Sequence, residues 1–457
     1  MKKIRVFLAI LACKLARALL RFLGRGGTDA PGRVALKLCP DVLGVMAKGV
    51  TTILVTGTNG KTTTSRMLEQ VLADSEISYF ANRSGANLLS GVTAEFAANC
   101  TLGGVCRKKT ALIEADEAAF KAISRFVHAS VIVVTNVFRD QLDRYGEVMH
   151  TLDNLRIGLK NSPEAVLCLN ADDSLCSSLA GDVDNRVVFY GVNVPIYPSR
   201  VAELSDAKYC IRCKSEYRYD YVTYGHLGGW SCPCCGYARQ QPSVAVTQVK
   251  LSDGDCSQIE ITADGTAIPV TVNLPGGYNI YNAAATIAGA EAAGLELSVA
   301  AHALGHFSCG FGRMEKFRVG EAYVRMILIK NPAGCNQVLN FLSQRRDPFS
   351  FAACLNDRAQ DGRDVSWIWD VDFERLTELG ELLQTVYACG TRAYDMALRF
   401  AYAGIPREKI VVCETYEQLL QAVSEQKTQA YFMPTYTAML ALRGVCTKKY
   451  GLKAFWE

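Results

Sequence analysis

The 457-residue sequence lacks two features that would decide its class at once. No segment holds about 20 uninterrupted apolar residues, the length that spans a bilayer, so we expect a soluble protein. Charge of one sign is not in excess either: the net charge of +4 does not by itself indicate a nucleic-acid partner. Hydrophobic residues make up 49% of the chain, which is enough for two or three domains with separate cores.

Cysteine is abundant, with 18 residues, but most cysteines lie inside apolar runs. Examples are Cys168 in VLCLN and Cys354 in FAACLN. We expect them to be small buried residues in a reducing compartment rather than a disulfide framework.

The first residues, MKKIRVFLAILACKLARALLRFLGR, predict an amphipathic helix. Lys14, Arg17 and Arg21 recur at helical spacing and form a cationic stripe. Such a helix packs on the next domain or contacts a membrane surface, and the sequence leaves both interpretations open.

Residues 51–64, TTILVTGTNGKTTT, predict a nucleotide site: a β-branched strand, a glycine turn, and a helix from Thr62 onward. Gly57 and Gly60 let backbone N–H groups face phosphate oxygens, Lys61 supplies a positive charge, and Thr62 offers a hydroxyl to magnesium. Val55 occupies the position of the first glycine of the usual Walker pattern, so the loop has the shorter G-x-x-G-K-T form. The predicted ATP-binding residues of the loop are Gly57, Thr58, Asn59, Gly60, Lys61, Thr62 and Thr63.

Two later strands should end near this loop in a parallel sheet. ALIEADE ends a strand at Glu114, and SVIVVTNVFRD carries Asn136 and Asp140. Glu114 is a candidate magnesium ligand because hard cations bind carboxylate oxygens. The alternative for Glu114, and more so for Asp140, is a carboxylate that only caps a helix or forms a salt bridge.

An alanine-rich helix is predicted at GGYNIYNAAATIAGA, with Asn279 and Asn282 on one face. These amides either contact an adenine edge or cap the helix, and the sequence leaves both open.

Two C-x-x-C pairs, Cys210/Cys213 and Cys232/Cys235, are separated by 18 residues and predict a zinc ribbon. Cys234 competes with Cys235, but only Cys235 keeps the two-residue gap. We predict a structural site because four thiolates leave no open coordination position; redox-active dithiols are the alternative. The flanks hold few basic residues interleaved with aromatics, which disfavours nucleic-acid binding.

Towards the C-terminus, FAACLN, TVYACGT, KIVVCE and QAYFMP predict strands alternating with helices, a second α/β structure. The loop after the first of these strands is acidic and contains two tryptophans, Trp367 and Trp369. Its aspartates are Asp357, Asp361, Asp364, Asp370 and Asp372.

In this order and spacing, TGTNGKTTT, EADEAAF, TNVFRDQLDRYGE, LNADD, YNIYNAAA and GRME resemble the Mur ligase family from about Val50 to the C-terminus. The resemblance implies activation of a carboxylate as an acyl phosphate, followed by attack of an amine. By the same resemblance Lys61 and Glu114 act in catalysis, with Thr62 and Glu114 at magnesium. It also implies nucleotide contacts for a further set of residues: Asn136, Asn282 at the base, and Arg313 from the interdomain hinge. Gln141 and Tyr145 stand where the family motif has histidines, which puts its second-metal arrangement in doubt.

The cysteine quartet, NPAGCNQ at residues 331–337 and DGRDVSW at residues 361–367 resemble one branch, MurT, the synthetase subunits of lipid II isoglutaminyl synthase. This resemblance implies a GatD-type glutaminase partner with a catalytic cysteine and histidine. Asp364, by its place in the motif, would orient that histidine, because a carboxylate fixes the imidazole tautomer and stabilises its charged form.

We therefore predict an α/β protein in three parts. They are an amphipathic segment (residues 1–49), a Mur-ligase-like ATPase domain with a parallel sheet (50–312, ribbon about 205–240), and a Rossmann-like C-terminal domain that contacts the glutaminase (313–457). ATP, Mg²⁺ and Zn²⁺ are the expected cofactors, and no nucleic acid is expected.

The predicted reaction amidates the D-glutamate α-carboxylate of the lipid II stem peptide in the cytoplasm, and a location at the inner face of the membrane is left open. The alternatives are a Mur or folylpolyglutamate-type ligase joining an amino acid to a soluble precursor, and a zinc-ribbon ATPase that binds nucleic acid.

Overall fold

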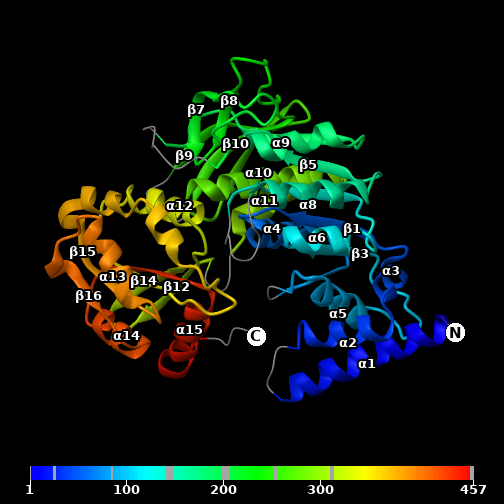
Figure 1. Ribbon diagram of the computed structural model, residues 1–457, viewed down its shortest axis with the longest axis horizontal. Coiled ribbons are helices and arrows are strands. Elements are labelled where there is room, and N and C mark those ends of the chain that lie inside the picture. The colour runs from blue at the N-terminus through cyan, green and yellow to red at the C-terminus, as the bar shows by residue number, and fades with distance from the viewer. Residues whose placement is uncertain are drawn as a thin grey trace.

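The computed structural model describes residues 2–23, 27–83, 86–139, 148–197, 206–251, 256–308 and 313–452. Two sheets organise the chain, one of nine strands and one of six, together with a separate two-stranded hairpin. Figure 1 shows the six-stranded sheet and its helices as one body, with the nine-stranded sheet beside it. The N-terminal helices lie at the far edge of the nine-stranded part.

The larger sheet has the strand order β11-β10-β9-β6-β5-β4-β1-β3-β2. Its parallel strands are β1 (Thr51–Thr56), β2 (Tyr79–Ala81), β3 (Thr110–Glu114), β4 (Val131–Val134), β5 (Val166–Asn170), β6 (Val187–Val192) and β9 (Val244–Leu251). β10 (Ser257–Ala263) runs antiparallel to β9 and to β11 (Thr266–Val272). The parallel sheet around residues 51–56 is confirmed, whereas the β9–β11 meander was not predicted.

Helices cover both faces of this sheet, because alternate residues of each strand point to opposite sides. In β1, Ile53 and Val55 face one core and Leu54 the other. The first face is covered by α4 (Lys61–Asp74), α10 (Gly277–Ala292) and α11 (Leu297–His306). The second is covered by α5 (Leu89–Asn99), α6 (Glu117–Ile123), α8 (Val148–Lys160), α9 (Ser174–Ser178) and the 3₁₀ helix η1 (Leu179–Asp182).

Three N-terminal helices pack against α5. They are α1 (Lys2–Phe22), α2 (Ala30–Leu38) and α3 (Val42–Ala47). The α2–α5 approach requires Gly32, because a Cβ atom there would collide with the Ser90 carbonyl. The prediction of an α1 helix is confirmed. No described helix is long and apolar enough to cross a membrane.

The predicted cationic stripe of α1 turns largely toward the protein. Lys14 donates a hydrogen bond to the Cys100 carbonyl at 2.6 Å, and Arg17 pairs with Glu95 at 3.1 Å. The exposed side of the helix is apolar instead, since helical periodicity alone does not say which face finds a partner.

Most predicted buried cysteines, among them Cys168 and Cys354, are buried thiols. The expectation of an entirely reduced set is wrong for one pair, because Cys100 and Cys106 form a disulfide. The turn between them places the two residues opposite each other in an isolated antiparallel bridge.

The smaller sheet has the order β12-β13-β17-β14-β15-β16. Its predicted strands are present and parallel: β14 (Phe349–Cys354), β15 (Leu383–Cys389), β16 (Ile410–Val412) and β17 (Gln429–Pro434). An antiparallel hairpin, β12 (Arg313–Val319) and β13 (Ala322–Ile327), extends the sheet and was not predicted.

Helices lie on both sides of this second sheet. They are α12 (Pro332–Leu342), α13 (Ala393–Tyr402), α14 (Tyr416–Ser424), α15 (Tyr436–Tyr450) and the 3₁₀ helices η2 (Ser366–Asp370), η3 (Phe373–Leu382) and η4 (Arg407–Lys409). The predicted second α/β structure at the C-terminus is thus confirmed.

Candidate active site

The loop between β1 and α4 is held in place by its glycines. Gly57 has φ +112° and Gly60 has φ +87°, in the region that favours glycine. A Cβ atom on Gly57 would collide with Thr135, and one on Gly60 with the Asn282 side chain. The loop therefore lies close against the end of β4 and the start of α10, with the N-terminus of α4 behind it.

Lys61, the first residue of α4, is buried beside this loop. Its Nζ atom donates to the Gly57 carbonyl at 2.5 Å and to the Glu117 carboxylate at 2.8 Å. Burial by itself would lower the pKa of Lys61, but the carboxylates of Glu117 and Asp116 outweigh it and raise the pKa. Lys61 is therefore a permanent cation in the turn that would hold phosphate.

Thr62 and Glu114 lie together, as the sequence predicts. The Thr62 hydroxyl donates to Glu114 Oε1 at 3.0 Å, and Glu114 is buried. Asn82 holds the backbone of Glu114 from both sides, accepting from its N–H and donating to its carbonyl, each at 2.8 Å. A hydroxyl and a carboxylate are the hard oxygen donors that suit magnesium, so these residues fit the ion that the fold implies.

Asn136 and Phe138, after β4, clamp the loop from the other side. The Asn136 amide accepts from the Asn59 N–H at 2.9 Å and donates to the Asn59 carbonyl at 3.0 Å. The Thr58 hydroxyl accepts from the Phe138 N–H at 3.1 Å. The backbone of the loop is thus fixed to the segment that follows β4.

A cavity of about 110 Å³ lies between the two sheets' domains, directly against the loop. Its walls on the loop side include Asn59, Gly60, Thr63, Asn136, Asn279 and Asn282. From the C-terminal part come Met314, Ile327, Leu328, Ala333, Gly334, Gln337 and Val338, and the remaining walls are Tyr224, Leu274 and Tyr278. One wall is polar and the other is mostly apolar, the combination found in ligand sites, and the cavity directly borders the loop.

Asn279 and Asn282, the two amides on one face of α10, make different hydrogen bonds. Asn279 donates to the Pro275 carbonyl at 2.7 Å and so holds the start of α10. Asn282 donates to Asn279 at 3.0 Å and lines the cavity beside Gly60. Of the two amides, Asn282 is the one placed for a nucleotide contact.

Gln337, on α12, is the cavity residue that the sequence did not single out. It is 3% exposed, and neither polar atom of its amide has a hydrogen-bond partner among the described residues. Burying such a group unpaired is unfavourable, so an unpaired amide in a cavity wall indicates a ligand contact. The N-cap residue of the same helix, Asn331, contacts the phosphate loop directly, because its amide donates to Asn59 Oδ1 at 3.0 Å.

Some predicted residues are not placed. Asp140, Gln141 and Tyr145 lie outside the described residues, and of Arg313 only the backbone, at the start of β12, is described.

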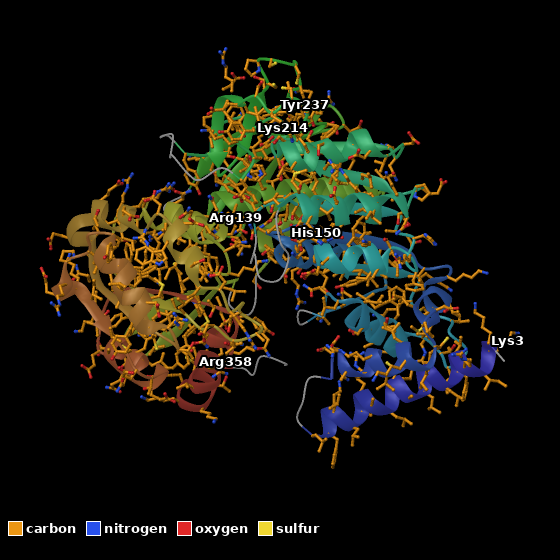
Figure 2. The ribbon with its side chains drawn as sticks, in the orientation of Figure 1. Lys3, Arg139, His150, Lys214, Tyr237 and Arg358 are labelled. Carbon is orange, nitrogen blue, oxygen red and sulfur yellow. A yellow bond between two sulfur atoms is a disulfide. The ribbon has the colours of Figure 1, made fainter. Side chains whose placement is uncertain are left out.

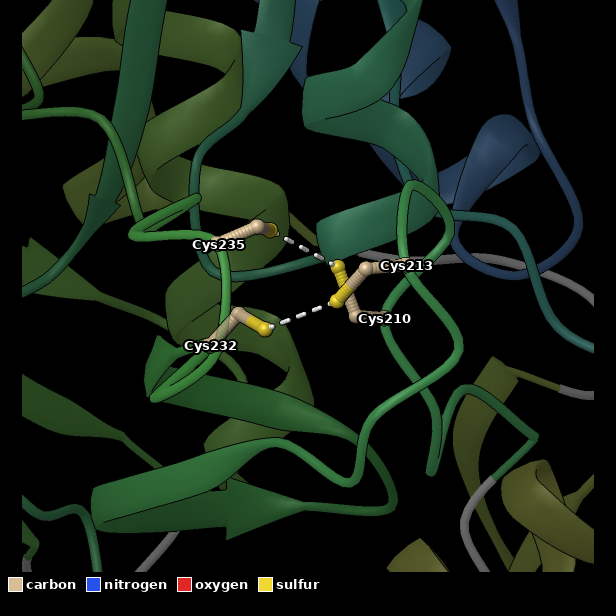
Figure 3. Close-up of side chains that lie close together, drawn as sticks. All are labelled: Cys210, Cys213, Cys232 and Cys235. Atoms are coloured by element: carbon tan, nitrogen blue, oxygen red, sulfur yellow. Dashed lines mark hydrogen bonds between the residues drawn. The ribbon is translucent and has the colours of Figure 1, made fainter.

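The cysteine quartet converges as the spacing predicts (Figure 3). Cys210 and Cys235 sulfurs are 3.7 Å apart, those of Cys213 and Cys232 are 3.4 Å apart, and all four lie within 4.8 Å of one another. Tetrahedral zinc with bonds of ~2.3 Å separates thiolate sulfurs by ~3.8 Å, so the four residues fit zinc. Hydrogen bonds from Ser215 lower the pKa of Cys213 to about 6, which favours the ligating thiolate.

The hairpin of the ribbon, β7 (Arg218–Tyr224) and β8 (Leu227–Ser231), packs against the ATPase sheet. His226 contacts Asp173 at 3.1 Å, and Trp230 donates to the Ala171 carbonyl at 3.0 Å. Phe138 stacks on Tyr224, with ring centroids 5.7 Å apart. The tip of the hairpin therefore supports the same Phe138 that holds the phosphate loop.

Asp364 differs from the other aspartates of the acidic loop. It is partly exposed, and among the described residues it accepts hydrogen bonds only from Ser366, with the Ser366 N–H at 2.8 Å. These hydrogen bonds lower the pKa of Asp364. The other four each bind a residue elsewhere: Asp357 binds Arg392, Asp361 binds Thr437, Asp370 binds Arg139, and Asp372 binds Arg375.

Beside this loop lies an exposed apolar patch, made of Trp369, Tyr394, Leu398 and Tyr402. Tyr394, Leu398 and Tyr402 follow one another at four-residue spacing along α13, and Trp369 contacts the Tyr402 ring at 5.4 Å. The patch presents a surface suited to a protein partner.

Comparison with known proteins agrees with both halves of this arrangement. Residues 55–224 match the model of the Mur ligase middle domain, and residues 328–439 match that of the MurT ligase C-terminal region. The chain is 33% identical over 443 residues to the Streptococcus pneumoniae lipid II isoglutaminyl synthase (glutamine-hydrolyzing) subunit MurT, covering 96% of each chain. It is 32% identical over 436 residues to the Staphylococcus aureus subunit of the same name, covering 95% of this chain and 96% of that one.

Solved structures resemble the fold at lower identity. A pseudomurein peptide ligase type C from Methanothermus fervidus superposes with a TM-score of 0.69 at 19% identity, covering 90% of this chain and 80% of that one. A folylpolyglutamate synthase from Mycobacterium tuberculosis has a TM-score of 0.61 at 13% identity, covering 98% of this chain and 96% of that one. These similarities establish a Mur-ligase-like α/β fold.

Proposed function

This chain belongs to the MurT family of ATP-dependent ligases, and we propose from that premise that it amidates the D-glutamate α-carboxylate in the stem peptide of lipid II. The observation that carries the proposal is the pairing, in one chain, of a nucleotide cavity walled by both domains with a partly exposed Asp364 in the MurT-type loop. The nitrogen comes from glutamine, hydrolysed on a GatD-type glutaminase subunit.

The chemistry requires two steps at one cleft. A carboxylate oxygen of the substrate attacks the terminal phosphorus of ATP, which gives an acyl phosphate and ADP. Ammonia then attacks the acyl carbon, the C–O bond to phosphate breaks, and amide and phosphate are formed. Activation is needed because a carboxylate has no adequate leaving group.

The residues of the loop have distinct roles in this proposal. Lys61 neutralises charge on the phosphates, and the N–H groups from Gly60 to Thr63, at the start of α4, hold their oxygens. Thr62 and Glu114 would hold magnesium, which supplies further charge neutralisation on the phosphates. Without nucleotide, Lys61 pairs with the Glu117 carboxylate. When the nucleotide binds, Lys61 would pair with phosphate as well as with Glu117.

The cavity itself recognises the nucleoside. Asn282 and the unpaired amide of Gln337 stand on opposite domains, so the base or ribose that bridges them would draw the domains together. Arg313, at the start of β12, adds a contact from the same hinge. The ribbon cysteines would hold a structural zinc. The zinc would fix the hairpin whose Tyr224 and His226 pack on Phe138.

The glutaminase would dock on the C-terminal part. The patch of Trp369, Tyr394, Leu398 and Tyr402 supplies an apolar contact area, and Trp369 belongs to the same loop as Asp364. Asp364 has no cation of this chain to neutralise it among the described residues, so it remains free to orient the partner's histidine.

We also propose that the N-terminal segment (1–49), the ATPase part (50–312) and the C-terminal part (313–457) act as separate domains. The complex would work in the cytoplasm at the inner face of the membrane.

The test is an acceptor-choice assay with the purified chain and its copurifying subunit. Lipid II and Mg-ATP are supplied with glutamine, with an ammonium salt, or with a panel of amino acids, and the product is identified by mass. We expect a product in which a carboxyl hydroxyl is replaced by an amino group, from glutamine and from ammonium alike. An amino-acid adduct, or turnover only on a folate or a UDP-linked precursor, would assign the chain to the alternative ligase types, and ATP hydrolysis stimulated by DNA or RNA would assign it to the nucleic-acid class.

A further inference from the structure

Helix α1 packs on the protein by one narrow face only. Val6, Ala9, Ile10 and Cys13 are 4% exposed or less and belong to the core shared with α2, α3 and α5. Beyond Cys13 the helix binds the protein through Lys14, which donates to the Cys100 carbonyl, and through Arg17, which binds Glu95 and the Ala94 carbonyl. The remaining faces of the helix are open.

The face opposite this core is an apolar stripe. Its residues are Ile4, Phe7, Leu8, Leu15, Leu19 and Phe22, which are between 42% and 88% exposed. The spacing of three, four and seven residues puts them on one side of the helix, and from Ile4 to Phe22 the stripe runs ~27 Å at 1.5 Å per residue. No other helix among the described residues exposes so many large apolar side chains.

Charge along α1 has one sign. The helix contains no acidic residue, and its basic residues are Lys2, Lys3, Arg5, Lys14, Arg17 and Arg21. Lys3 and Arg21, at opposite ends of the helix, are exposed and have no hydrogen-bond or ion-pair partner among the described residues. Figure 2 shows Lys3 at the outer edge of the molecule. The stripe is thus bordered by free cations at both ends.

A groove of about 1070 Å³ lies directly behind the C-terminal half of α1. Four cations line it, two from α1 and two from the sheet edge: Arg17, Arg21, Arg83 and Lys108. Two carboxylates, Glu76 and Glu95, also line it, so its lining keeps a net positive charge. A smaller pocket that shares Ala81 and Arg83 with this groove reaches Thr62 and Glu114. Arg17 and Arg21 of α1 therefore face a basic groove whose wall, at Ala81 and Arg83, also borders the small pocket at Thr62 and Glu114.

We propose that the apolar stripe of α1 lies in the plane of an anionic lipid surface, with Lys3 and Arg21 at the level of the phosphate groups. An in-plane helix inserts its apolar side into the boundary between head groups and acyl chains while its cations bind anionic lipid. This geometry sets the mouth of the basic groove at the surface, where the head of a membrane-anchored substrate is found. The inference deepens the proposed location of the enzyme and does not depend on which carboxylate is amidated.

A lipid surface fits this face better than a protein does. The stripe is carried by a single helix, α1, which lies at the edge of the molecule (Figure 1), and a protein partner would need a matching groove ~27 Å long at the rise of 1.5 Å per residue. A second copy of the chain would bring like charges together at both ends of an antiparallel helix pair. An anionic surface instead meets the apolar stripe and the cations at once.

The test uses flotation with vesicles of equal parts phosphatidylglycerol and phosphatidylcholine, on the full-length chain in the complex in which it purifies. Wild type should float with these vesicles and much less with phosphatidylcholine alone. The variant Phe7→Ser/Leu15→Ser/Leu19→Ser should keep about a tenth of that binding or less, since partitioning scales with buried apolar area. Lys3→Glu/Arg21→Glu should lose binding selectively to the anionic vesicles, most clearly at low salt.

Ile157→Ser is the control, because it removes an exposed aliphatic side chain from α8, outside α1 and outside the surface proposed for the glutaminase. It should leave vesicle binding unchanged. Thermal unfolding and nucleotide binding of the triple variant should match wild type, since none of its three side chains belongs to the core. Equal flotation of the triple variant and wild type would overturn the proposal. So would a triple variant that turns a wild-type dimer into a monomer or releases the copurifying subunit while vesicle binding persists, which would assign the stripe to a protein contact. Because flotation needs neither ATP nor glutamine, its failure leaves the amidation assay untouched.

Discussion

Arg139 and Asp370 form an ion pair, with Nη2 and Oδ2 2.8 Å apart, that joins the end of β4 beside the phosphate loop to the acidic loop carrying Asp364. Arg139 lies where the two parts of the molecule face each other (Figure 2), and its guanidinium also contacts Asp206 at 3.7 Å. The pair therefore connects the cleft for ATP with the surface proposed for the glutaminase.

We expect Asp370→Asn to weaken the transfer of ammonia rather than the fold. The two side chains are 33% and 39% exposed, and such a pair is worth about 1 kcal/mol at most, so stability should change little. Glutamine-driven amidation should fall by up to about fivefold, the rate equivalent of ~1 kcal/mol, while ammonium-driven amidation changes less. Arg139→Ala should behave alike, and the double variant should be no worse than either single one. Additive losses would show that the two residues act separately.

Lys61→Ala should abolish ATP-dependent turnover while the protein stays folded, because Lys61 binds the loop and Glu117 rather than the core. The raised pKa keeps Lys61 charged throughout the neutral range, so the pH profile of ATP binding should show no loss as pH rises until the solution is strongly alkaline. Lys108→Ala, an exposed lysine, is the control for ATP binding. Wild-type turnover by the alanine variant would remove Lys61 from the site.

Gln337→Leu should weaken nucleotide binding about tenfold, the loss of one hydrogen bond or two, without lowering the melting temperature. Burying the unpaired amide lowers the free energy of unfolding of the unliganded protein. An apolar side chain of similar size should therefore leave that free energy equal or raise it. Titration calorimetry with ADP and thermal unfolding measure the two effects. Gln344→Leu, an exposed neighbour beyond the end of α12, should change neither. A destabilised variant that still binds ADP normally would make Gln337 a structural residue.

The ribbon should hold one zinc per chain, and Cys213→Ser should release it, whereas Cys234→Ser should not. Because the ribbon's Tyr224 and His226 pack on Phe138, zinc loss should also weaken nucleotide binding. Elemental analysis and ADP titration on both variants check this. Zinc-free protein from the wild-type preparation, purified without chelator, would contradict the assignment.

Asp364→Asn should remove glutamine-driven amidation and spare the ammonium-driven reaction. The amide keeps the size of the side chain but favours the wrong imidazole tautomer on the partner, and free ammonia bypasses the glutaminase. The lowered pKa of Asp364 keeps it ionised as pH falls toward the weakly acidic range, so its own titration should not limit activity there. Amidated lipid II is measured with each nitrogen source in turn.

Asp361→Ala is the contrasting variant in the same loop. Asp361 is 4% exposed and accepts from the Thr437 N–H at 2.7 Å, at the start of α15. Its loss should lower the melting temperature and reduce both reactions together, by the ~1 kcal/mol or more typical of a lost helix cap. The opposite pattern, with Asp361 selective for glutamine, would move the orienting role to that residue.

Local pattern was enough for much of this protein. Strand, glycine turn and helix around Lys61 could be predicted because each is specified by neighbouring residues, and two C-x-x-C turns bring thiols together wherever the hairpin lies. The parallel C-terminal strands were likewise visible as short apolar runs. The β9–β11 meander and the β12–β13 hairpin were not predicted, although β10 alternates buried and more exposed residues as a half-buried strand does.

Only the tertiary structure decided which of several equivalent residues is free. Five aspartates share one loop, and packing commits four of them to partners outside it while Asp364 remains available. Gln337 lines the cavity beside the phosphate loop from the C-terminal part of the chain, a placement that no local pattern encodes. The cations of α1 were evident from spacing, but a helical period does not say which side is buried: Lys14 and Arg17 found partners on the protein, and the apolar stripe was left outside. Sequence specifies the faces of an element, and the free energy of packing the whole chain selects the face that is covered.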